Sequence, residues 1–159
     1  GPIHKSDVGG VVLNVKDAET VAAEFERMIK IKDTTAILIQ PMLSGLELFA
    51  GAKKEGLFGH MLLCGLGGIF IEVLKDVASE LVPIDRTMAH TMIKKLKSYA
   101  LLEGVRGQQG IDIDAFATVL VRLSALLQIA PEISELDLNP LLGTSKAVVA
   151  VDARININK

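Results

Sequence analysis

The sequence of 159 residues has no tryptophan, one tyrosine, five phenylalanines and a single cysteine, Cys64. A lone cysteine cannot form a disulfide within the chain, so we expect a reducing, cytoplasmic environment in which Cys64 only packs. So few aromatic rings offer little for stacking on bases, and the 17 basic residues, set against 19 acidic ones, do not gather into one block. These shortages argue against a protein that binds nucleic acid.

A hydrophobic run long enough to span a membrane is also missing. Half of the residues are hydrophobic and the mean hydropathy is +0.41. The longest stretch of apolar residues and glycines nevertheless covers only residues 61–71, which is too short to cross a bilayer. We therefore expect no association with a membrane.

The chain length suits one domain or part of one, and the absence of repeats, low-complexity tracts and linkers favours one compact unit. The first two residues, Gly1-Pro2, resemble the remnant of a protease site, and a dense motif begins at once at His4. We expect residues 1–159 to be the C-terminal portion of a domain whose upstream part is missing.

Apolar periodicity and turn residues predict a mixture of strands and helices. Three helices are predicted to follow the N-capping residues Asp17, Asp85 and Asp112, and Met88 should face inward on the second of them. Short apolar and β-branched segments predict strands at residues 9–15, 35–40, 46–52, 60–64, 69–73, 133–142 and 147–152. Those between 46 and 73 lie too close together for intervening helices, so the sequence predicts an α+β fold with an antiparallel sheet and packed helices.

The last predicted hairpin carries a row of oxygen-bearing side chains. Strand periodicity places Glu135, Asp137 and Asn139 on one face. If the turn centres between residues 144 and 145, Asp137 lies directly opposite Asp152, and two like charges at this distance destabilise the hairpin unless a cation compensates them. A hard divalent cation such as Mg²⁺ prefers such oxygen ligands.

A solvated hairpin is the alternative interpretation of the same residues. The turn that brings Asp137 opposite Asp152 also brings Glu135 opposite Arg154, which would neutralise part of the negative charge. Spacing alone does not choose between a metal site and solvated carboxylates.

The motifs of the chain resemble, in their order, the ATP-grasp domain of NDP-forming acyl-CoA synthetases, the ADP-forming acetate–CoA ligase family, which is related to the succinyl-CoA synthetase β subunit. The motifs that carry this resemblance are HKSDVGGV at residues 4–11, GLGGIFIEV at 65–73, Arg106-Gly107, ELDLNP at 135–140 and VDAR at 151–154. The family converts acyl-CoA, ADP and phosphate into free acid, CoA and ATP. The resemblance therefore implies an ATP-grasp-like fold and an ATP/ADP-binding enzyme.

The resemblance also implies roles for individual residues, beginning with the metal. Asn139 and Asp152 match the family's Mg²⁺ ligands, and Asp137 stands at the position of a nearby acidic group. Mg²⁺ at this place would bridge the nucleotide phosphates.

Four further segments match parts of the family's nucleotide site. Gln40-Pro41-Met42 corresponds to the hinge strand whose backbone recognises adenine, and Glu47 to a carboxylate near the ribose. Gly67-Gly68 and Glu72 correspond to the loop and strand that line the phosphate region, where glycines allow close approach of the backbone. Without the resemblance, the glycines predict an ordinary hairpin turn.

Two residues match catalytic elements of the family. His4 lies in a segment similar to the mobile one that carries a second phosphohistidine in the subfamily with split subunits. A neutral imidazole is a suitable nucleophile near pH 7. Arg106 matches an Arg-Gly element and could bind phosphate through its planar guanidinium. The alternatives are a disordered or loop-packing terminal histidine for His4 and a surface salt bridge for Arg106. We expect no special role for His60 and His90.

The implied partners are the CoA-binding part of the same enzyme, fused or as a separate subunit, with CoA and a small carboxylic acid as substrates, in an oligomeric full-length enzyme. The phosphate-gripping lobe lies upstream in relatives, so we expect the isolated chain to be inactive. Two other classes stay open: a degenerate ATP-grasp module that regulates a protein acyltransferase, and a non-enzymatic interaction module.

Overall fold

The computed structural model describes residues 8–68, 75–105, 107 and 109–157. It divides the chain into two compact units, Gly1–Leu43 and Ser44–Lys159, so the prediction of one compact unit was wrong. Each unit is described by itself below.

The first unit contains one helix, α1 (Ala18–Met28). The predicted cap is confirmed, because the Asp17 carboxylate accepts a hydrogen bond from the Thr20 N–H at 2.7 Å. The Arg27 guanidinium donates to the Gly9 carbonyl at 2.8 Å and so attaches the preceding segment to the helix. No residue of α1 is buried.

The strands predicted at residues 9–15 and 35–40 were wrong, because neither segment is a strand. Both have strand-forming composition, but a strand needs a ladder partner, and the described sheet is built from the second unit alone. The strand predicted at 69–73 lies outside the described residues.

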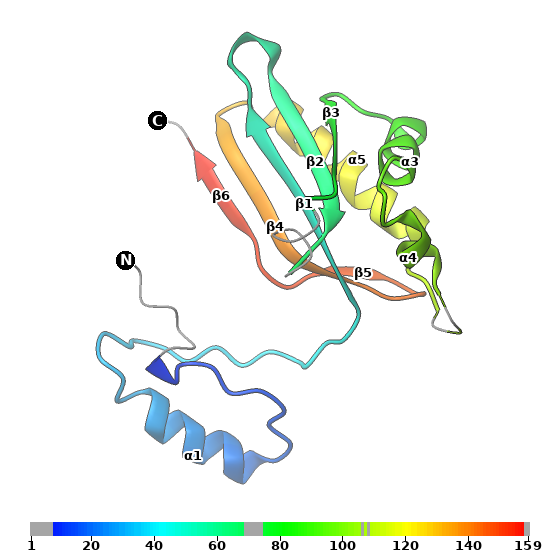
Figure 1. The fold of residues 1–159 in the computed structure, drawn as a ribbon. Coiled ribbons are helices and arrows are strands. Elements are labelled where there is room, and N and C mark those ends of the chain that lie inside the picture. The colour runs from blue at the N-terminus through cyan, green and yellow to red at the C-terminus, as the bar shows by residue number, and fades with distance from the viewer. Residues whose placement is uncertain (1–7, 69–74, 106, 108, 158–159) are drawn as a thin grey trace. The chain divides into compact units, whose positions relative to one another are not determined.

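The second unit is an antiparallel sheet with helices packed on it, as predicted (Figure 1). Its strands are β1 (Leu46–Lys54), β2 (His60–Leu66), β3 (Val77–Leu81), β4 (Ile133–Gly143), β5 (Val148–Ala150) and β6 (Arg154–Ile157). Its helices are the 3₁₀ turn η2 (Gly56–Phe58), α3 (Arg86–Lys94), α4 (Tyr99–Glu103) and α5 (Ile113–Ile129). The strand order is β3-β2-β1-β4-β5, and β6 pairs with β4 beyond the end of β5.

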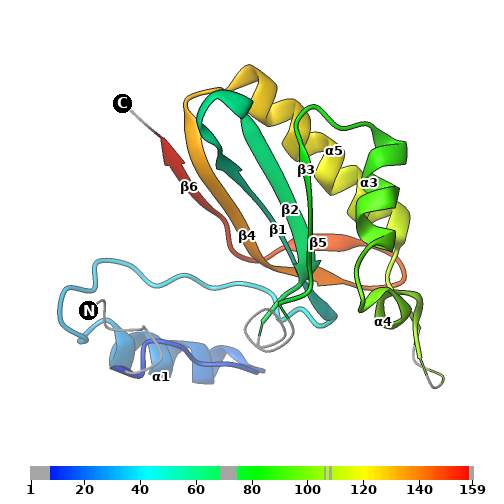
Figure 2. The ribbon, with the colours of Figure 1, turned by 45° about the horizontal axis from the view of Figure 1, so that its top comes forward.

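The helices α3 and α5 lie together on one side of the sheet (Figure 2). Both begin at their predicted caps, since Asp85 accepts from the Met88 N–H and Asp112 from the Ala115 N–H, each at 2.8 Å. Met88 itself is exposed rather than inward, because Ala89, Met92 and Ile93 form the buried side of α3.

The core of the second unit lies between the sheet and these helices. Its largest fully buried side chains include Leu48, Leu62, Met92, Phe116 and Leu120. Cys64 belongs to this core, and burial, followed by the charge of Asp76, raises the pKa of its thiol to about 12. The thiol therefore stays protonated, in agreement with a packing role.

Candidate functional site

The second face of the sheet carries a row of polar side chains. On β4, Leu136 faces the core and is buried, whereas the neighbouring Glu135 and Asp137 point to the opposite side. On β1, Gly51 pairs with Asp137, and Lys53 pairs with Glu135. We call this side of β1, β4 and β6 the polar face.

A β-bulge lies in the middle of this row. The register between β1 and β4 shifts between Leu48 and Ala50, so that Asn139 and Pro140 together lie opposite Phe49. A bulge adds local twist to a strand and changes the direction of its side chains, and bulges are frequent beside functional sites. The predicted ligand Asn139 is therefore at an irregular point of the sheet.

The predicted register of the C-terminal hairpin was wrong, because Asp137 pairs with Arg154 and not with Asp152. The turn lies one residue later than expected: the Thr144 N–H donates to the Ala147 carbonyl at 2.9 Å, and the Thr144 hydroxyl accepts from the Ala147 N–H at 3.2 Å. This shift of the turn centre by one residue moves the register by two.

Asp152 lies between two strands, since the strand predicted at 147–152 is the shorter β5, which ends at Ala150, and a strand that was not predicted, β6, begins at Arg154. The Val151 N–H donates to the Pro140 carbonyl at 3.0 Å. The register on both sides of Asp152 places it level with Asn139. The corrected register thus still brings Asp137, Asn139 and Asp152 to the same part of the polar face.

The electrostatics of this cluster are unfavourable for Asp137. Burial raises the pKa of its carboxyl, the neighbouring Arg154 lowers it, and the charges of Glu135 and Asp152 raise it, so that the pKa lies above its ordinary value. Asp152 is therefore close enough for its charge to act on Asp137. Extra positive charge at this place would stabilise the ionised form of Asp137.

The donor set fits a hard divalent cation. It consists of two carboxylates and one amide oxygen, from Asp137, Asp152 and Asn139, and Mg²⁺ prefers oxygen ligands and takes the rest of its shell from water and phosphates. Among the residues that the structure describes, no group of three or more His, Cys, Asp and Glu side chains could hold a metal ion by itself. This cluster has only two carboxylates in position, which is the number that a Mg²⁺–phosphate site needs.

The structure brings three of the predicted nucleotide-site residues, Glu47, Gly67 and Gly68, together near the N-terminal end of β1. The Gly67 N–H donates to the Glu47 carbonyl at 2.7 Å. Gly68 has a φ of +60°, and a Cβ at this position would collide with the Glu47 carboxylate. The positive φ favours glycine at 68, whereas the exposed Glu47 side chain could rotate away from an added Cβ.

The remaining predicted residues lie in the first unit or outside the described residues. Gln40, Pro41 and Met42 lie in the first unit, where they are exposed and in no regular element. His4, Arg106 and Glu72 lie outside the described residues.

Sequence reasoning left Arg154 out of the candidate site, although the residue stands beside two of the predicted ligands. Its pairing with Asp137 and the distance of 3.7 Å from its Nε to Asp152 Oδ2 place it within the carboxylate cluster. The spacing of two between Asp152 and Arg154 was the signal that could have identified it, because residues two apart on a strand share a face.

The two other histidines of the described chain have partners within the fold. His60 is buried, with Nε2 at 2.6 Å from the Ile133 carbonyl oxygen. His90 places its Nε2 3.0 Å from Asp114 Oδ1, and this carboxylate also contacts Arg86. Both histidines thus have partners within the fold, and we assign neither a catalytic role.

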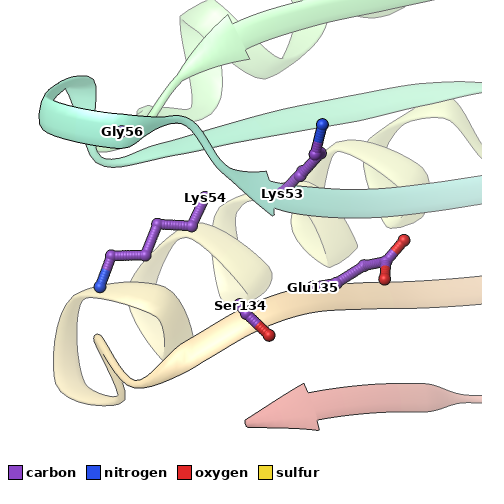
Figure 3. Close-up of a pocket in the computed structure, with 5 residues that line it drawn as sticks. All are labelled: Lys53, Lys54, Gly56, Ser134 and Glu135. Carbon is purple, nitrogen blue, oxygen red and sulfur yellow. The ribbon is translucent and has the colours of Figure 1, made fainter. Parts of the chain in front are cut away.

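A recess also lies where β1 ends and β4 begins. It is lined by Lys53, Lys54, Gly56, Ser134 and Glu135 (Figure 3). Each of its polar side chains has a partner within the protein. Lys54 donates to the Pro131 carbonyl, Lys53 pairs with Glu55, and Ser134 and Glu135 both bond to Asn156. These side chains are engaged in holding the sheet end together, so we do not assign the recess a ligand.

No helix among the described residues is long and apolar enough to cross a membrane.

Comparison with known proteins identifies what this architecture resembles. The sequence matches a family described as an ATP-grasp domain over residues 2–157. It is 41% identical over 160 residues to acetate–CoA ligase (ADP-forming) I of Archaeoglobus fulgidus, covering 96% of this chain and 23% of that protein. It is 37% identical over 161 residues to acetate–CoA ligase (ADP-forming) I subunit beta of Pyrococcus furiosus, covering 96% of this chain and 69% of that subunit.

A solved structure extends this similarity to three dimensions. Dinucleotide-forming acetyl-coenzyme A synthetase 1 of Ca. Korarchaeum cryptofilum superposes with a TM-score of 0.87 at 36% identity, covering 99% of this chain and 73% of that one. That protein was crystallised with coenzyme A and Mg-AMPPCP, with its phosphohistidine segment pointing towards the nucleotide-binding site.

Proposed function

This chain belongs to the family of ATP-grasp domains that occur in ADP-forming acid–CoA ligases, and on this premise we propose that it is the nucleotide-binding part of such a ligase. The observation that carries the proposal is the convergence of Asp137, Asn139 and Asp152 on the polar face of the sheet. This oxygen cluster suits a metal–phosphate complex, and the similarity covers almost the whole chain.

The complete ligase would convert acyl-CoA, ADP and phosphate into a free acid, CoA and ATP. The chain spans 23% of the Archaeoglobus ligase and 69% of the Pyrococcus β subunit. We therefore assign to it the phosphoryl exchange with the nucleotide, whereas the CoA-binding part and the acid site belong to other domains or to another subunit of an oligomeric enzyme. The acyl group that the enzyme transfers is derived from a small carboxylic acid.

In this proposal Asp137, Asn139 and Asp152 hold Mg²⁺, which when bound neutralises charge on the nucleotide phosphates. Gln40, Pro41 and Met42 recognise the base, and Glu47 lies beside the ribose. Gly67 and Gly68 support this arrangement, because the Gly67 N–H donates to the Glu47 carbonyl and Gly68 leaves room for the Glu47 carboxylate. Glu72 lines the phosphate region, and Arg106 binds phosphate.

His4 is the phosphoryl carrier in this proposal. In the direction of ATP synthesis, an oxygen of the ADP β-phosphate attacks the phosphorus of phosphorylated His4. The P–O bond of ATP forms, the P–N bond breaks, and the imidazole keeps the electron pair. In the reverse direction the neutral imidazole attacks the γ-phosphorus of ATP and ADP leaves.

The test is to incubate the full-length protein with Mg·ATP and to map phosphate by mass spectrometry at neutral pH, because phosphohistidine is lost in acid. We expect phosphate on His4. Asp152→Asn should slow the labelling at least ~10-fold, the lower end of the effect of damaging a metal site. Asp114→Asn is the matched control, since it removes an exposed carboxylate at the start of α5, on another element, and labelling should be unchanged.

Other outcomes distinguish the alternatives. Phosphate on a different histidine would keep the enzyme class and remove His4 from the reaction. Nucleotide binding without any phosphohistidine would favour a degenerate regulatory module. Absence of nucleotide binding would favour an interaction module.

A further inference from the structure

Arg154 is the cation of the carboxylate cluster in this structure. It pairs with Asp137 across β4 and β6, and its Nε lies 3.7 Å from Asp152 Oδ2. Glu135, on the same face of β4, is bonded to Asn156 instead. One guanidinium therefore serves two carboxylates, those of Asp137 and Asp152.

The contact between Arg154 and Asp152 is looser than comparable pairs in the same chain. Arg86 approaches Asp114 to 3.1 Å and Arg27 approaches Glu24 to 2.7 Å, both within hydrogen-bond distance. At 3.7 Å, Arg154 supplies charge without a direct hydrogen bond. Its side chain is 81% exposed, so no packing opposes a change of rotamer.

Arg154 also lies at the place where a divalent cation would bind. Asp137 and Asp152 are the two carboxylates assigned above to the metal, and Arg154 is in contact with one and paired with the other. A divalent cation placed between these carboxylates repels a guanidinium at the same place. Both cannot occupy the cluster in the arrangement that the structure describes.

We propose that Arg154 is a positioning residue that acts as the built-in counter-ion of Asp137 and Asp152, and that a divalent cation displaces it on binding. This inference rests on the proposed function in one respect, namely that these two aspartates hold the metal. The displaced guanidinium stays beside the site, where its planar fork suits the phosphate oxygens of an incoming nucleotide.

The experiment measures Mn²⁺ binding to the full-length protein without nucleotide, by the electron paramagnetic resonance of free Mn²⁺. Arg154→Gln should tighten the dissociation constant by ~3-fold, the size expected for losing an exposed ionic competitor. Arg154→Lys keeps the charge and should stay close to wild type. Arg86→Gln, which removes an exposed arginine from a pair with Asp114, should leave Mn²⁺ binding unchanged.

A second readout separates competition from a structural role. The rise in Tm on adding Mg²⁺ should be larger in Arg154→Gln than in wild type, because the metal-free variant lacks its counter-ion. A structural residue would instead lower the Tm equally with and without Mg²⁺. Unchanged or weaker Mn²⁺ binding in Arg154→Gln would overturn the inference.

Failure of the proposed metal site has a different signature. Asp152→Asn should abolish or strongly weaken Mn²⁺ binding. If Mn²⁺ binds wild type and Asp152→Asn equally, or does not bind wild type, the metal site is wrong and the role of Arg154 fails with it. If Asp152→Asn loses Mn²⁺ while Arg154→Gln gains nothing, only the role of Arg154 is refuted.

Discussion

At the scale of single residues, Gly68 is under two separate constraints that can be measured apart. Its φ of +60° disfavours any side chain, and a Cβ would also meet the carboxylate of the exposed Glu47 side chain. Gly56 has a φ of +49°, but a Cβ there would meet nothing within 4 Å, so Gly56 carries the backbone constraint alone. The two glycines therefore form a matched pair.

We predict that Gly68→Ala destabilises the protein about as much as Gly56→Ala. Each should cost about 1 kcal/mol from the backbone, because the exposed Glu47 side chain can rotate away from the added methyl group. Urea unfolding at neutral pH measures both. A larger cost for Gly68→Ala that disappears when Glu47→Ala is added would contradict this prediction and show that the collision is not relieved.

The shared face of Asp137 and Glu135 could be predicted at this scale, since strand periodicity is local. The partner of Asp137 could not be predicted in the same way. It depends on the position of a turn closed by Thr144 and Ala147, and an error of one residue in the turn centre exchanged Arg154 for Asp152. For this reason Arg154 was not predicted beside Asp137.

At the scale of elements, Asp76 fastens the segment between α3 and α4 to the start of β3. The buried carboxylate accepts from the Lys97 N–H at 2.9 Å and from the Ser98 N–H at 2.7 Å. Burial raises the pKa of Asp76, but the hydrogen bonds from Ser98 and Lys97 and the Lys97 charge outweigh it, so the pKa lies below its ordinary value of 3.8.

A lowered pKa means that the native state favours the ionised carboxylate. The stability contributed by Asp76 is fully present above 3.8, and it is lost as the pH falls below 3.8 through the lowered pKa. We predict that Asp76→Asn loses about 1.5–3 kcal/mol at pH 7, the usual worth of hydrogen bonds to a charged group, and loses less at pH 3. Urea titrations at both pH values measure the difference, and an equal loss at both would contradict the ionised form as the stabilising one.

The elements that could be predicted are those with local signals. The caps at Asp85 and Asp112 were correct, because a side chain three residues before its backbone partner needs nothing from the rest of the fold. The segments 9–15 and 35–40 have strand composition, yet whether they form strands depends on a partner elsewhere in the chain. Composition carries no information about that partner.

At the scale of the whole chain, the hydrophobic core belongs to one unit only. Among the described residues, every buried apolar side chain lies in Ser44–Lys159, beginning with Leu48. The helix of the other unit, α1, buries none of its residues. An isolated helix of 11 residues is marginal in water, so the two units should differ greatly in stability.

We predict that residues 44–159, expressed alone, unfold cooperatively in urea with a midpoint close to that of residues 1–159. Two cap variants in the longer chain provide the matched control. Asp112→Ala removes the cap of α5 and should lower the midpoint, at a cost of about 1 kcal/mol, whereas Asp17→Ala removes the cap of α1 and should leave the midpoint unchanged. A lower midpoint for residues 44–159, or for Asp17→Ala, would mean that the first unit stabilises the sheet.

Under the proposed function, residues 44–159 should also lose nucleotide affinity while retaining Mn²⁺ binding, because Gln40, Pro41 and Met42 are removed and Asp137, Asn139 and Asp152 remain.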